Sequence, residues 1–318
     1  MTGPSSALRL GTRGSALALA QSTAIAQRVT ELTGREVVLV PITTAGDLSA
    51  EPLASMGGVG VFVNALREAL LAGEIDFAVH SLKDLPTADP SGLVVAAIPP
   101  REDPRDALVA RDGLVLGELP SGSRIGTGSP RRAAQLRALG LGLEIVEIRG
   151  NVDTRLRKVA DGELDGVVLA RAGLLRLGRA DEITEVIDPI QMLPAPGQGA
   201  LAVECRDPDS GAAAAEVFAA LRGLDDPWTR SAVAAERSLL ATLEAGCSAP
   251  VGALGEAVEG DPEAGEEDEL YLRATVLATD GTAAVRQSTT GPLVEAEMLG
   301  RKLAAEMLAD GADLLMQS

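Results

Sequence analysis

Residues 7–34, ALRLGTRGSALALAQSTAIAQRVTELTG, begin with a short apolar run and continue through a glycine-rich turn into a long alanine-rich segment. The run at 7–10 is typical of a β-strand, and Ser15 can cap a helix that extends to about residue 32. Gly34 comes just after that segment, where a helix is expected to end. A strand joined to a helix in this way is the repeating unit of an α/β fold.

The same stretch superficially resembles a secretory signal, because two arginines precede a run of alanine and leucine. Gln21, Ser22 and Thr23 interrupt the apolar run before it reaches the usual length of a signal core. The polar residues recur as they do in an amphipathic helix, so we interpret the segment as part of the fold. We therefore expect a cytoplasmic protein.

Strand and helix patterns alternate through the first 200 residues, which predicts mostly parallel sheets. Ser129-Pro130 places a capping hydroxyl before a proline at the first helical position and predicts a helix to about residue 139. Further strands are predicted at 36–42, 75–80, 93–98, 107–110, 144–148 and 166–170.

Two proline-rich segments, 99–104 and 193–199, bracket a self-contained α/β unit. If a strand at 200–205 returns to the first sheet, both segments are crossings between two lobes with a cleft between them. Ordinary surface turns are the alternative explanation. The predicted domains are lobe 1 (1–100 plus 198–222), an inserted lobe 2 (101–197) and a C-terminal α+β domain (223–318).

The pattern changes in the C-terminal part of the chain. A long helical run covers 228–245, and two strands, 270–278 and 283–289, flank the hairpin signal Asp280-Gly281. An amphipathic helix is expected at about 293–309. The acidic segment 256–269 is expected to form a mobile hairpin loop and not a binding site.

Composition excludes several classes of function. The 318 residues carry a formal net charge of −18, which disfavours binding to nucleic acid or anionic membranes. No apolar stretch reaches the roughly 20 residues needed to span a bilayer. There is one histidine, His80, and the two cysteines, Cys205 and Cys247, lack metal-site spacing, so we expect no metal centre and no disulfide. No P-loop motif occurs, so nucleotide hydrolysis is not indicated.

Arginines stand beside glycines and hydroxyls in three places, each after a predicted strand. Backbone N–H groups and guanidinium groups can converge there on an anion at a helix N-terminus. Such repetition suggests a ligand with several carboxylates or phosphates, whereas helix caps with solvated arginines are the structural alternative. The three motifs are Gly11-Thr12-Arg13-Gly14-Ser15, Gly126-Thr127-Gly128-Ser129-Pro130-Arg131-Arg132, and Arg149-Gly150-Asn151 followed by Arg155 and Arg157.

Residues 79–86, VHSLKDLP, place Lys83 and Asp84 at the carboxyl end of a predicted strand, where α/β proteins usually bind ligands. Asp84 beside a positive neighbour could stabilise a developing cation, or could simply be a turn residue before proline. Taken alone, His80 is more typical of a core or cleft wall than of a catalyst. Spacing alone likewise favours a structural role for Cys247, just past a helix end, and a core position for Cys205.

Taken together, these motifs resemble the porphobilinogen deaminase family over nearly the whole chain. The resemblance implies two lobes of the type II periplasmic-binding-protein kind and a C-terminal α+β domain. The motifs that carry it are 10–15, 79–86, 128–132, 149–155, 194–200 and 245–252.

The resemblance also implies roles for individual residues. Cys247 matches the cysteine that holds a dipyrromethane cofactor through a thioether, and Asp84 matches the catalytic carboxylate. Arg176 matches a family position of less defined role. The residues matching positions that bind acetate and propionate groups of cofactor, substrate and growing chain are Arg13, Ser15, Lys83, Thr127, Ser129, Arg131, Arg132, Arg149 and Arg155.

In this family four porphobilinogen molecules condense with loss of ammonia on the primer, and hydrolysis releases linear hydroxymethylbilane. One departure is the loop Gly57-Gly58-Val59-Gly60, where family members often carry lysine, so this loop's role in holding carboxylates is in doubt. The alternatives are a non-catalytic two-lobed module that binds a polyanion and a thiol enzyme that acts through an acyl-cysteine. We expect a monomer.

Overall fold

The computed structural model describes residues 7–43, 63–88, 90–245, 249–261 and 266–316. The chain divides into two compact units, each assembled from two segments. Unit 1 comprises 1–101 and 200–230, and unit 2 comprises 102–199 and 231–318. One of the three changes between units therefore lies inside the proline-rich segment 99–104, and a second lies directly after the segment 193–199. The third lies within one helix, α8 (Pro227–Thr242).

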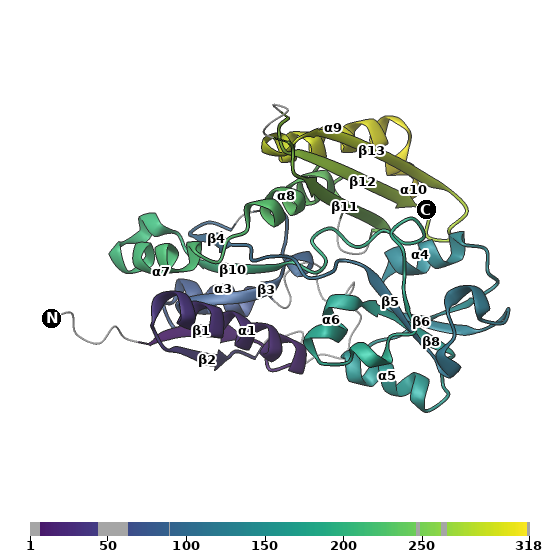
Figure 1. Cartoon of the computed structure of the whole chain (residues 1–318), viewed down its shortest axis with the longest axis horizontal. Helices are drawn as coiled ribbons and strands as arrows, with labels where there is room; N and C mark the ends of the chain where they lie inside the picture. The colour runs from purple at the N-terminus through teal and green to yellow at the C-terminus, as the bar shows by residue number, and fades with distance from the viewer. Residues whose placement is uncertain (1–6, 44–62, 89, 246–248, 262–265, 317–318) are drawn as a thin grey trace. The chain divides into compact units, whose positions relative to one another are not determined.

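Unit 1 contains a five-stranded sheet in the order β2-β1-β3-β10-β4 (Figure 1). Strands β1, β2 and β3 are parallel, and β10 is antiparallel to both β3 and β4. The strand predicted at 200–205 thus returns to the first sheet. The elements are β1 (Leu8–Thr12), α1 (Ala16–Thr33), β2 (Val37–Pro41), α3 (Asn64–Leu71), β3 (Phe77–Ser81), the 3₁₀ turn η1 (Leu82–Asp84), β4 (Leu93–Ala97), β10 (Leu201–Arg206), η5 (Pro208–Ser210) and α7 (Ala212–Arg222).

Lobe 2 repeats this plan with the sheet order β7-β6-β8-β5-β9. Strands β6, β7 and β8 are parallel, and β5 is antiparallel to β8 and β9. The elements are β5 (Asp106–Ala110), η2 (Arg111–Gly113), η3 (Leu116–Glu118), β6 (Arg124–Thr127), α4 (Pro130–Ala138), β7 (Glu144–Glu147), α5 (Val152–Ala160), β8 (Gly166–Ala170), α6 (Arg171–Arg176), η4 (Ala180–Glu182) and β9 (Glu185–Val186).

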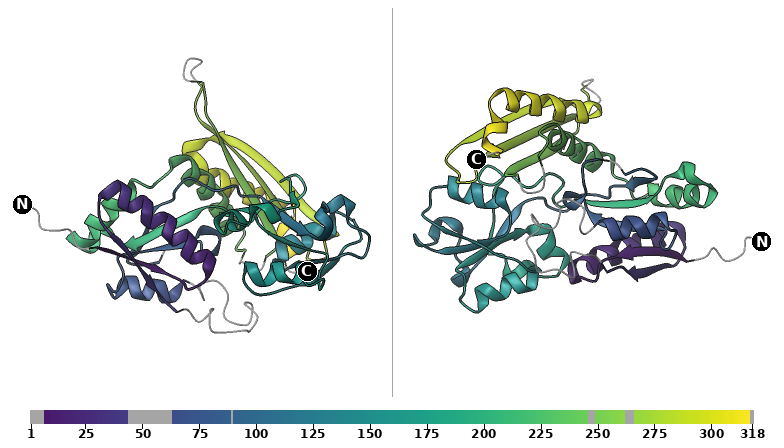
Figure 2. Two further views of the ribbon diagram at one scale, coloured as in Figure 1. Left: turned by 60° about the horizontal axis from the view of Figure 1, so that its bottom comes forward. Right: turned by 180° about the vertical axis from the view of Figure 1, so that it is seen from behind.

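The C-terminal domain is an antiparallel sheet, β11-β12-β13, with α9 and α10 packed on it (Figure 1). The ribbon formed by β11 and β12 projects beyond the rest of this domain (Figure 2). The elements are β11 (Val251–Val258), β12 (Glu269–Leu277), β13 (Ala284–Pro292), η6 (Leu293–Glu295), α9 (Ala296–Ala309) and α10 (Ala312–Met316). The predicted fold class, two α/β lobes and a smaller C-terminal α+β domain, is confirmed.

The predicted helix signals are found where expected. Ser15 accepts a hydrogen bond from the N–H of Ala18 at 3.3 Å, and Gly34 ends α1 with a φ of 68°. Ser129 caps α4 in the same way, with Pro130 at the first helical position. Side-chain and backbone groups of the cap satisfy N–H and C=O groups that a helix end leaves without partners.

Strand β11 was not predicted, and the expected loop at 256–269 was too long at both ends. Residues 256–258 belong to β11, and Glu269 begins β12. Two glycines, Gly252 and Gly255, weakened the strand signal. Both are required by close packing, since a Cβ on Gly255 would lie 2.8 Å from the carbonyl oxygen of Ala232.

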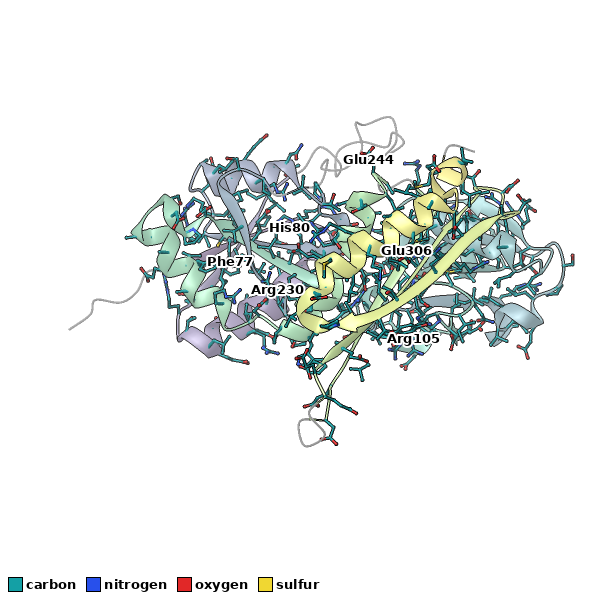
Figure 3. All side chains as sticks on the ribbon, turned by 90° about the horizontal axis from the view of Figure 1, so that it is seen from above. Phe77, His80, Arg105, Arg230, Glu244 and Glu306 are labelled. Atoms are coloured by element: carbon teal, nitrogen blue, oxygen red, sulfur yellow. The ribbon has the colours of Figure 1, made fainter. Side chains whose placement is uncertain are left out.

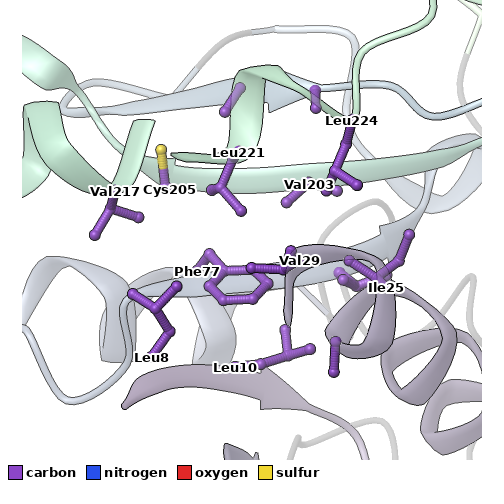
Figure 4. Close-up of a cluster of buried hydrophobic side chains, with 14 of the residues drawn as sticks. Leu8, Leu10, Ile25, Val29, Phe77, Val203, Cys205, Val217, Leu221 and Leu224 are labelled. Atoms are coloured by element: carbon purple, nitrogen blue, oxygen red, sulfur yellow. The ribbon is translucent and has the colours of Figure 1, made fainter. Parts of the chain in front are cut away.

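The two faces of the sheet in unit 1 are covered by different helices and bury different side chains. Phe77 and His80, both on β3, are labelled in Figure 3. Phe77 points into the apolar core beneath α1 and α7, together with Leu10, Val203 and Leu221 (Figure 4). His80 lies on the other side of the strand, because successive side chains alternate between the two faces. That face is covered by α3.

Candidate active site

The turn that carries Lys83 and Asp84 follows directly from strand β3 in unit 1. Leu82 and Leu85 are buried on either side of the two charged residues. The backbone N–H of Leu82 donates to the carbonyl of Ala200 at 3.0 Å, which ties the turn to the start of β10. Two apolar anchors and a backbone hydrogen bond therefore hold the charged residues at the surface.

Asp84 is exposed, whereas Lys83 is half-buried. Among the described residues, no ion pair or hydrogen bond involves the carboxylate of Asp84. Surface aspartates in this arginine-rich chain are often paired, as Asp103 is with Arg105 and Arg171. The carboxylate of Asp84 is thus available to an incoming group, as general acid–base or electrostatic catalysis requires.

The second motif of unit 1 joins β1 to α1. Thr12 is buried, and its hydroxyl oxygen accepts a hydrogen bond from Ser22 at 2.8 Å, which fixes the turn to the helix. Ser15 uses its oxygen as the helix cap and keeps its hydroxyl proton available as a donor. Arg13 is half-buried beside it. A donor and a guanidinium at one helix N-terminus suit an anion.

In lobe 2, Arg131 and Arg132 are buried and share one carboxylate. Asp106 accepts from Arg131 and Arg132 at 2.8 Å each, and from Gln198 at 2.8 Å. Burial alone raises the pKa of Asp106, but the charges of the two arginines outweigh it and hold the pKa well below its usual range. The carboxylate is therefore ionised inside the lobe.

This cluster assigns the two arginines a structural task. The guanidinium of Arg131 also donates to the carbonyl of Leu193, and that of Arg132 donates to the carbonyl of Val168. Their predicted direct contact with substrate carboxylates remains a prediction. Sequence reasoning missed Asp106, although an aspartate at the first position of an otherwise apolar strand was a signal. Thr127 is buried and accepts from the N–H of Ser129 at 3.2 Å.

Arg149 and Arg155 lie at the N-terminus of α5, which Asn151 caps through the N–H of Thr154 at 2.8 Å. Arg155 donates to the carbonyl of Gly150 at 2.8 Å. The pKa of Arg155 is lowered, first by burial and then by the charges of Arg132 and Arg149. Three guanidinium groups, those of Arg132, Arg149 and Arg155, therefore lie near one another in this lobe.

A glycine allows the two arginine motifs of lobe 2 to meet. A Cβ on Gly128 would lie 2.5 Å from the carbonyl oxygen of Ile148 and 3.9 Å from a terminal nitrogen of Arg155. The turn after β6 can approach the end of β7 only because residue 128 has no side chain. The carboxyl ends of these two parallel strands thus present a positive patch with backbone donors.

Arg176 stands apart from that patch. Its guanidinium donates to the carbonyl of Gly199 at 2.6 Å, in the second proline-rich segment. The same carbonyl accepts the N–H of Glu102, so the two segments run side by side within unit 2. Burial lowers the pKa of Arg176, and the charge of Glu102 partly opposes that effect. Its contacts are those of a residue that supports the segment.

Cys247 and the loop Gly57-Gly58-Val59-Gly60 lie outside the described residues. On either side of Cys247, α8 ends at Thr242 and β11 begins at Val251. In the described part of the chain, no three His, Cys, Asp or Glu side chains gather as a metal site. A search of the helices among those residues finds none with the length and apolar character of a bilayer span.

Comparisons with solved structures return chains of low sequence identity to this one. A periplasmic substrate-binding protein of an ABC transporter from Coxiella burnetii aligns with 67% of this chain and 91% of its own, at 15% identity and a TM-score of 0.41. The BvgS VFT2 domain from Bordetella pertussis aligns with 69% of this chain and 86% of its own, at 17% identity and a TM-score of 0.41.

The sequence comparisons find relatives of much higher identity that cover nearly the whole chain. The family model described as "Porphobilinogen deaminase, dipyromethane cofactor binding domain" matches residues 8–214, and "Porphobilinogen deaminase, C-terminal domain" matches 231–309. Porphobilinogen deaminase 1 of Streptomyces coelicolor is 60% identical over 318 residues, covering 98% of this chain and 97% of its own. The Mycobacterium tuberculosis porphobilinogen deaminase is 59% identical over 310 residues, covering 97% and 98%. The chain belongs to the porphobilinogen deaminase family.

Proposed function

We propose that this chain joins four porphobilinogen molecules, with loss of ammonia, on a dipyrromethane primer held by Cys247, and then releases hydroxymethylbilane by hydrolysis. The observation that carries the proposal is the match to both family domains over nearly the full length of close relatives. The residue roles that follow are inferred from where the structure places each side chain.

Asp84 is proposed as the catalytic carboxylate. Each porphobilinogen loses its amino group as ammonia when the C–N bond breaks, and the pyrrole nitrogen then carries positive charge. A new C–C bond forms to the free α-carbon of the terminal ring, and that carbon afterwards loses a proton. The exposed carboxylate of Asp84 can stabilise the cationic nitrogen and carry a proton between the two rings.

The cationic residues are proposed to bind the acetate and propionate groups. Each porphobilinogen carries two carboxylates, so elongation accumulates negative charge that a repeated guanidinium surface can neutralise. In lobe 2 this role falls to Arg149 and Arg155, with backbone groups near Gly128. In lobe 1 it falls to Arg13, Ser15 and Lys83.

The remaining predicted residues are proposed to bind carboxylates of the cofactor, substrate and growing chain as well, and their contacts also support the site. Arg131 and Arg132, locked on Asp106, would set the position of α4 and its cap, Ser129. Thr127 holds the backbone before that cap. Arg176 would steady the second crossing segment through the carbonyl of Gly199.

The cofactor would supply a pyrrole whose free α-carbon acts as the first nucleophile. The residues present fit such a group, because the positive patch of lobe 2 suits the carboxylates of a dipyrromethane. Cys247 would hold it through a thioether.

We further propose a cytoplasmic monomer with porphobilinogen as its small-molecule partner and with no affinity for nucleic acid or membranes. The net charge of −18 supports the last two points, since anionic surfaces repel such a protein.

The test is the intact mass of the purified protein, which should exceed that of the polypeptide by two pyrrole units. An aldehyde reagent specific for free-α pyrroles should then develop colour. Cys247→Ala should abolish both signals and leave a folded protein. A bare polypeptide mass, even after incubation with porphobilinogen, contradicts the function and favours the polyanion-binding module. Turnover without a stable adduct favours the acyl-cysteine alternative.

A further inference from the structure

A buried cluster of charged side chains lies beneath the end of strand β3 in unit 1. The carboxylate of Glu204 is completely buried and accepts hydrogen bonds from Arg67 at 2.9 and 3.1 Å. The Nε2 atom of His80 lies 3.2 Å from the other carboxylate oxygen. Three secondary structure elements, α3, β3 and β10, meet at this one carboxylate.

The register of the sheet explains how the three residues meet. Glu204 on β10 stands opposite Ala78 on β3, and His80 is two residues further along the same face. Diagonal neighbours of this kind are within reach of long side chains. Arg67 approaches from α3, whose residues Leu66 and Leu70 cover the same face of the sheet.

The cluster does not simply fill space. Burial alone raises the pKa of Glu204, but the contacts with His80 and Arg67 lower it, so the carboxylate is ionised. An apolar side chain of similar volume would fill the position without a desolvation penalty, and buried ion pairs are weak evidence for stability. What the cluster adds is direction: the hydrogen bonds from Arg67 hold the carboxylate of Glu204, and its second oxygen lies at contact distance from the His80 ring, although Nε2 of His80 makes no hydrogen bond there.

His80 connects this arrangement to the active-site turn. It is the residue before Ser81, at which β3 ends, and Lys83 and Asp84 follow within four positions. The turn itself is held by buried leucines and by the hydrogen bond from Leu82 to Ala200. The ladder between β3 and β10 also reaches Ser81, opposite Leu201, and the ring of His80 adds a side-chain contact with Glu204 one residue before that ladder ends.

We propose that Glu204 is a positioning residue which, through His80, holds the turn bearing Lys83 and Asp84 in the place from which Asp84 acts. This inference rests on the proposed role of Asp84. Glu204 does not touch substrate. It acts by fixing the last residues of β3, with Arg67 holding the carboxylate from the far side.

Two variants test the proposal in the cofactor-loaded protein. Glu204→Gln removes the charge that orders both partners, and His80→Gln removes the ring but leaves the Arg67–Glu204 pair. We expect kcat to fall about tenfold to a hundredfold in each, since a misplacement near 1 Å has effects of that size. The KM for porphobilinogen should rise by a smaller factor than kcat falls, because Lys83 moves with the turn, whereas Arg13, Arg149 and Arg155 are untouched.

A second readout is independent of activity. Backbone amide exchange in a peptide covering residues 77–88 should become faster in both variants, since the N–H of Leu85 donates to Leu82 within the turn and the N–H of Leu82 donates to Ala200. Intact mass should show the same cofactor loading as in wild type, which separates a misplaced turn from a missing primer.

Asp76→Asn is the matched control. Asp76 lies just before β3 and accepts two hydrogen bonds from the side chain of Arg9, at 2.8 and 3.2 Å. The control therefore removes the carboxylate of the Asp76–Arg9 ion pair, which lies at the opposite end of the same strand. We expect it to lower stability while kcat and exchange in the turn stay at wild-type values.

The possible outcomes distinguish a failure of the proposed function from a failure of the positioning role of Glu204. If wild type does not convert porphobilinogen, the proposed function fails. If wild type is active and His80→Gln retains wild-type kcat and exchange, the positioning role is wrong. An equal loss of kcat in Asp76→Asn also overturns it, because the effect is then general destabilisation. Should Glu204→Gln fail to fold, His80→Gln decides the question.

Discussion

Glu236 accepts the backbone N–H of Gly197 at 2.6 Å, so a fully buried carboxylate of α8 holds the second proline-rich segment. Its other carboxylate oxygen accepts the N–H of Gly255 in β11 at 2.8 Å. Both hydrogen bonds lie within unit 2. They join the C-terminal domain to the segment that leads out of lobe 2.

This relationship predicts the effect of Glu236→Gln. The side-chain oxygen of the glutamine can accept from one of the two backbone N–H groups, but its NH₂ group faces the other. That buried backbone N–H then has no acceptor. We expect a loss of about 1–3 kcal/mol in the free energy of unfolding, measured by urea titration. Glu306→Gln, at an exposed position of α9, should leave the free energy of unfolding unchanged, and equal effects in the two variants would contradict the assignment.

The buried pairing of Asp106 predicts how stability depends on pH. Its folded-state pKa is lower than the value near 3.9 of an unfolded chain. The stabilisation is therefore complete above that value and is lost as the pH falls through the acidic range toward the folded-state pKa. Unfolding measured from pH 6 down to about pH 3 should show the wild type losing stability faster than Asp106→Asn.

At neutral pH, Asp106→Asn should itself be strongly destabilised. Removing the carboxylate leaves the buried guanidinium groups of Arg131 and Arg132 without their counter-charge. The expected cost is about 3–5 kcal/mol. A variant as stable as wild type would show that the two arginines find other partners.

Asp84→Asn should separate chemistry from folding. Its side chain is exposed and makes no ion pair within the described residues, so the melting temperature should stay within a degree or two of wild type. Loss of the carboxylate should lower kcat by about 10²–10⁴-fold, the usual contribution of a general acid–base. Wild-type turnover in this variant would remove Asp84 from the mechanism.

Arg155→Gln and Arg149→Gln should differ in severity. Arg155 is partly buried beside Arg132, whereas Arg149 is exposed and pairs with Glu147 at 3.1 Å. A charge-assisted hydrogen bond contributes about 1.5–3 kcal/mol, so we expect roughly ten- to a hundredfold weaker binding for Arg155→Gln and less for Arg149→Gln. The measurement is the KM for porphobilinogen. Arg301→Gln, which breaks an exposed pair on α9, is the control.

Local sequence signals were sufficient for much of the architecture. Ser15 and Ser129 marked helix starts, and Asp280-Gly281 marked the β12–β13 hairpin. Such signals work because caps and turns depend on the conformational preferences of a few adjacent residues. The position of Asp84 at the end of a strand followed from the same reasoning. Strand β11 was missed because its glycines are required by close packing against Ala232 and Leu193, and both of these residues are distant in sequence.

The sequence alone determined which residues could carry chemistry: an arginine-rich set of turns, one aspartate at a strand end and two cysteines. Only the tertiary structure decided how they are used. It placed Arg131 and Arg132 on the buried Asp106, left Arg149 exposed and Arg155 half-buried, and brought Glu204 to His80 across a strand pair. The physical reason is that burial and pairing of charge depend on contacts between residues far apart in the chain, and no local pattern specifies them.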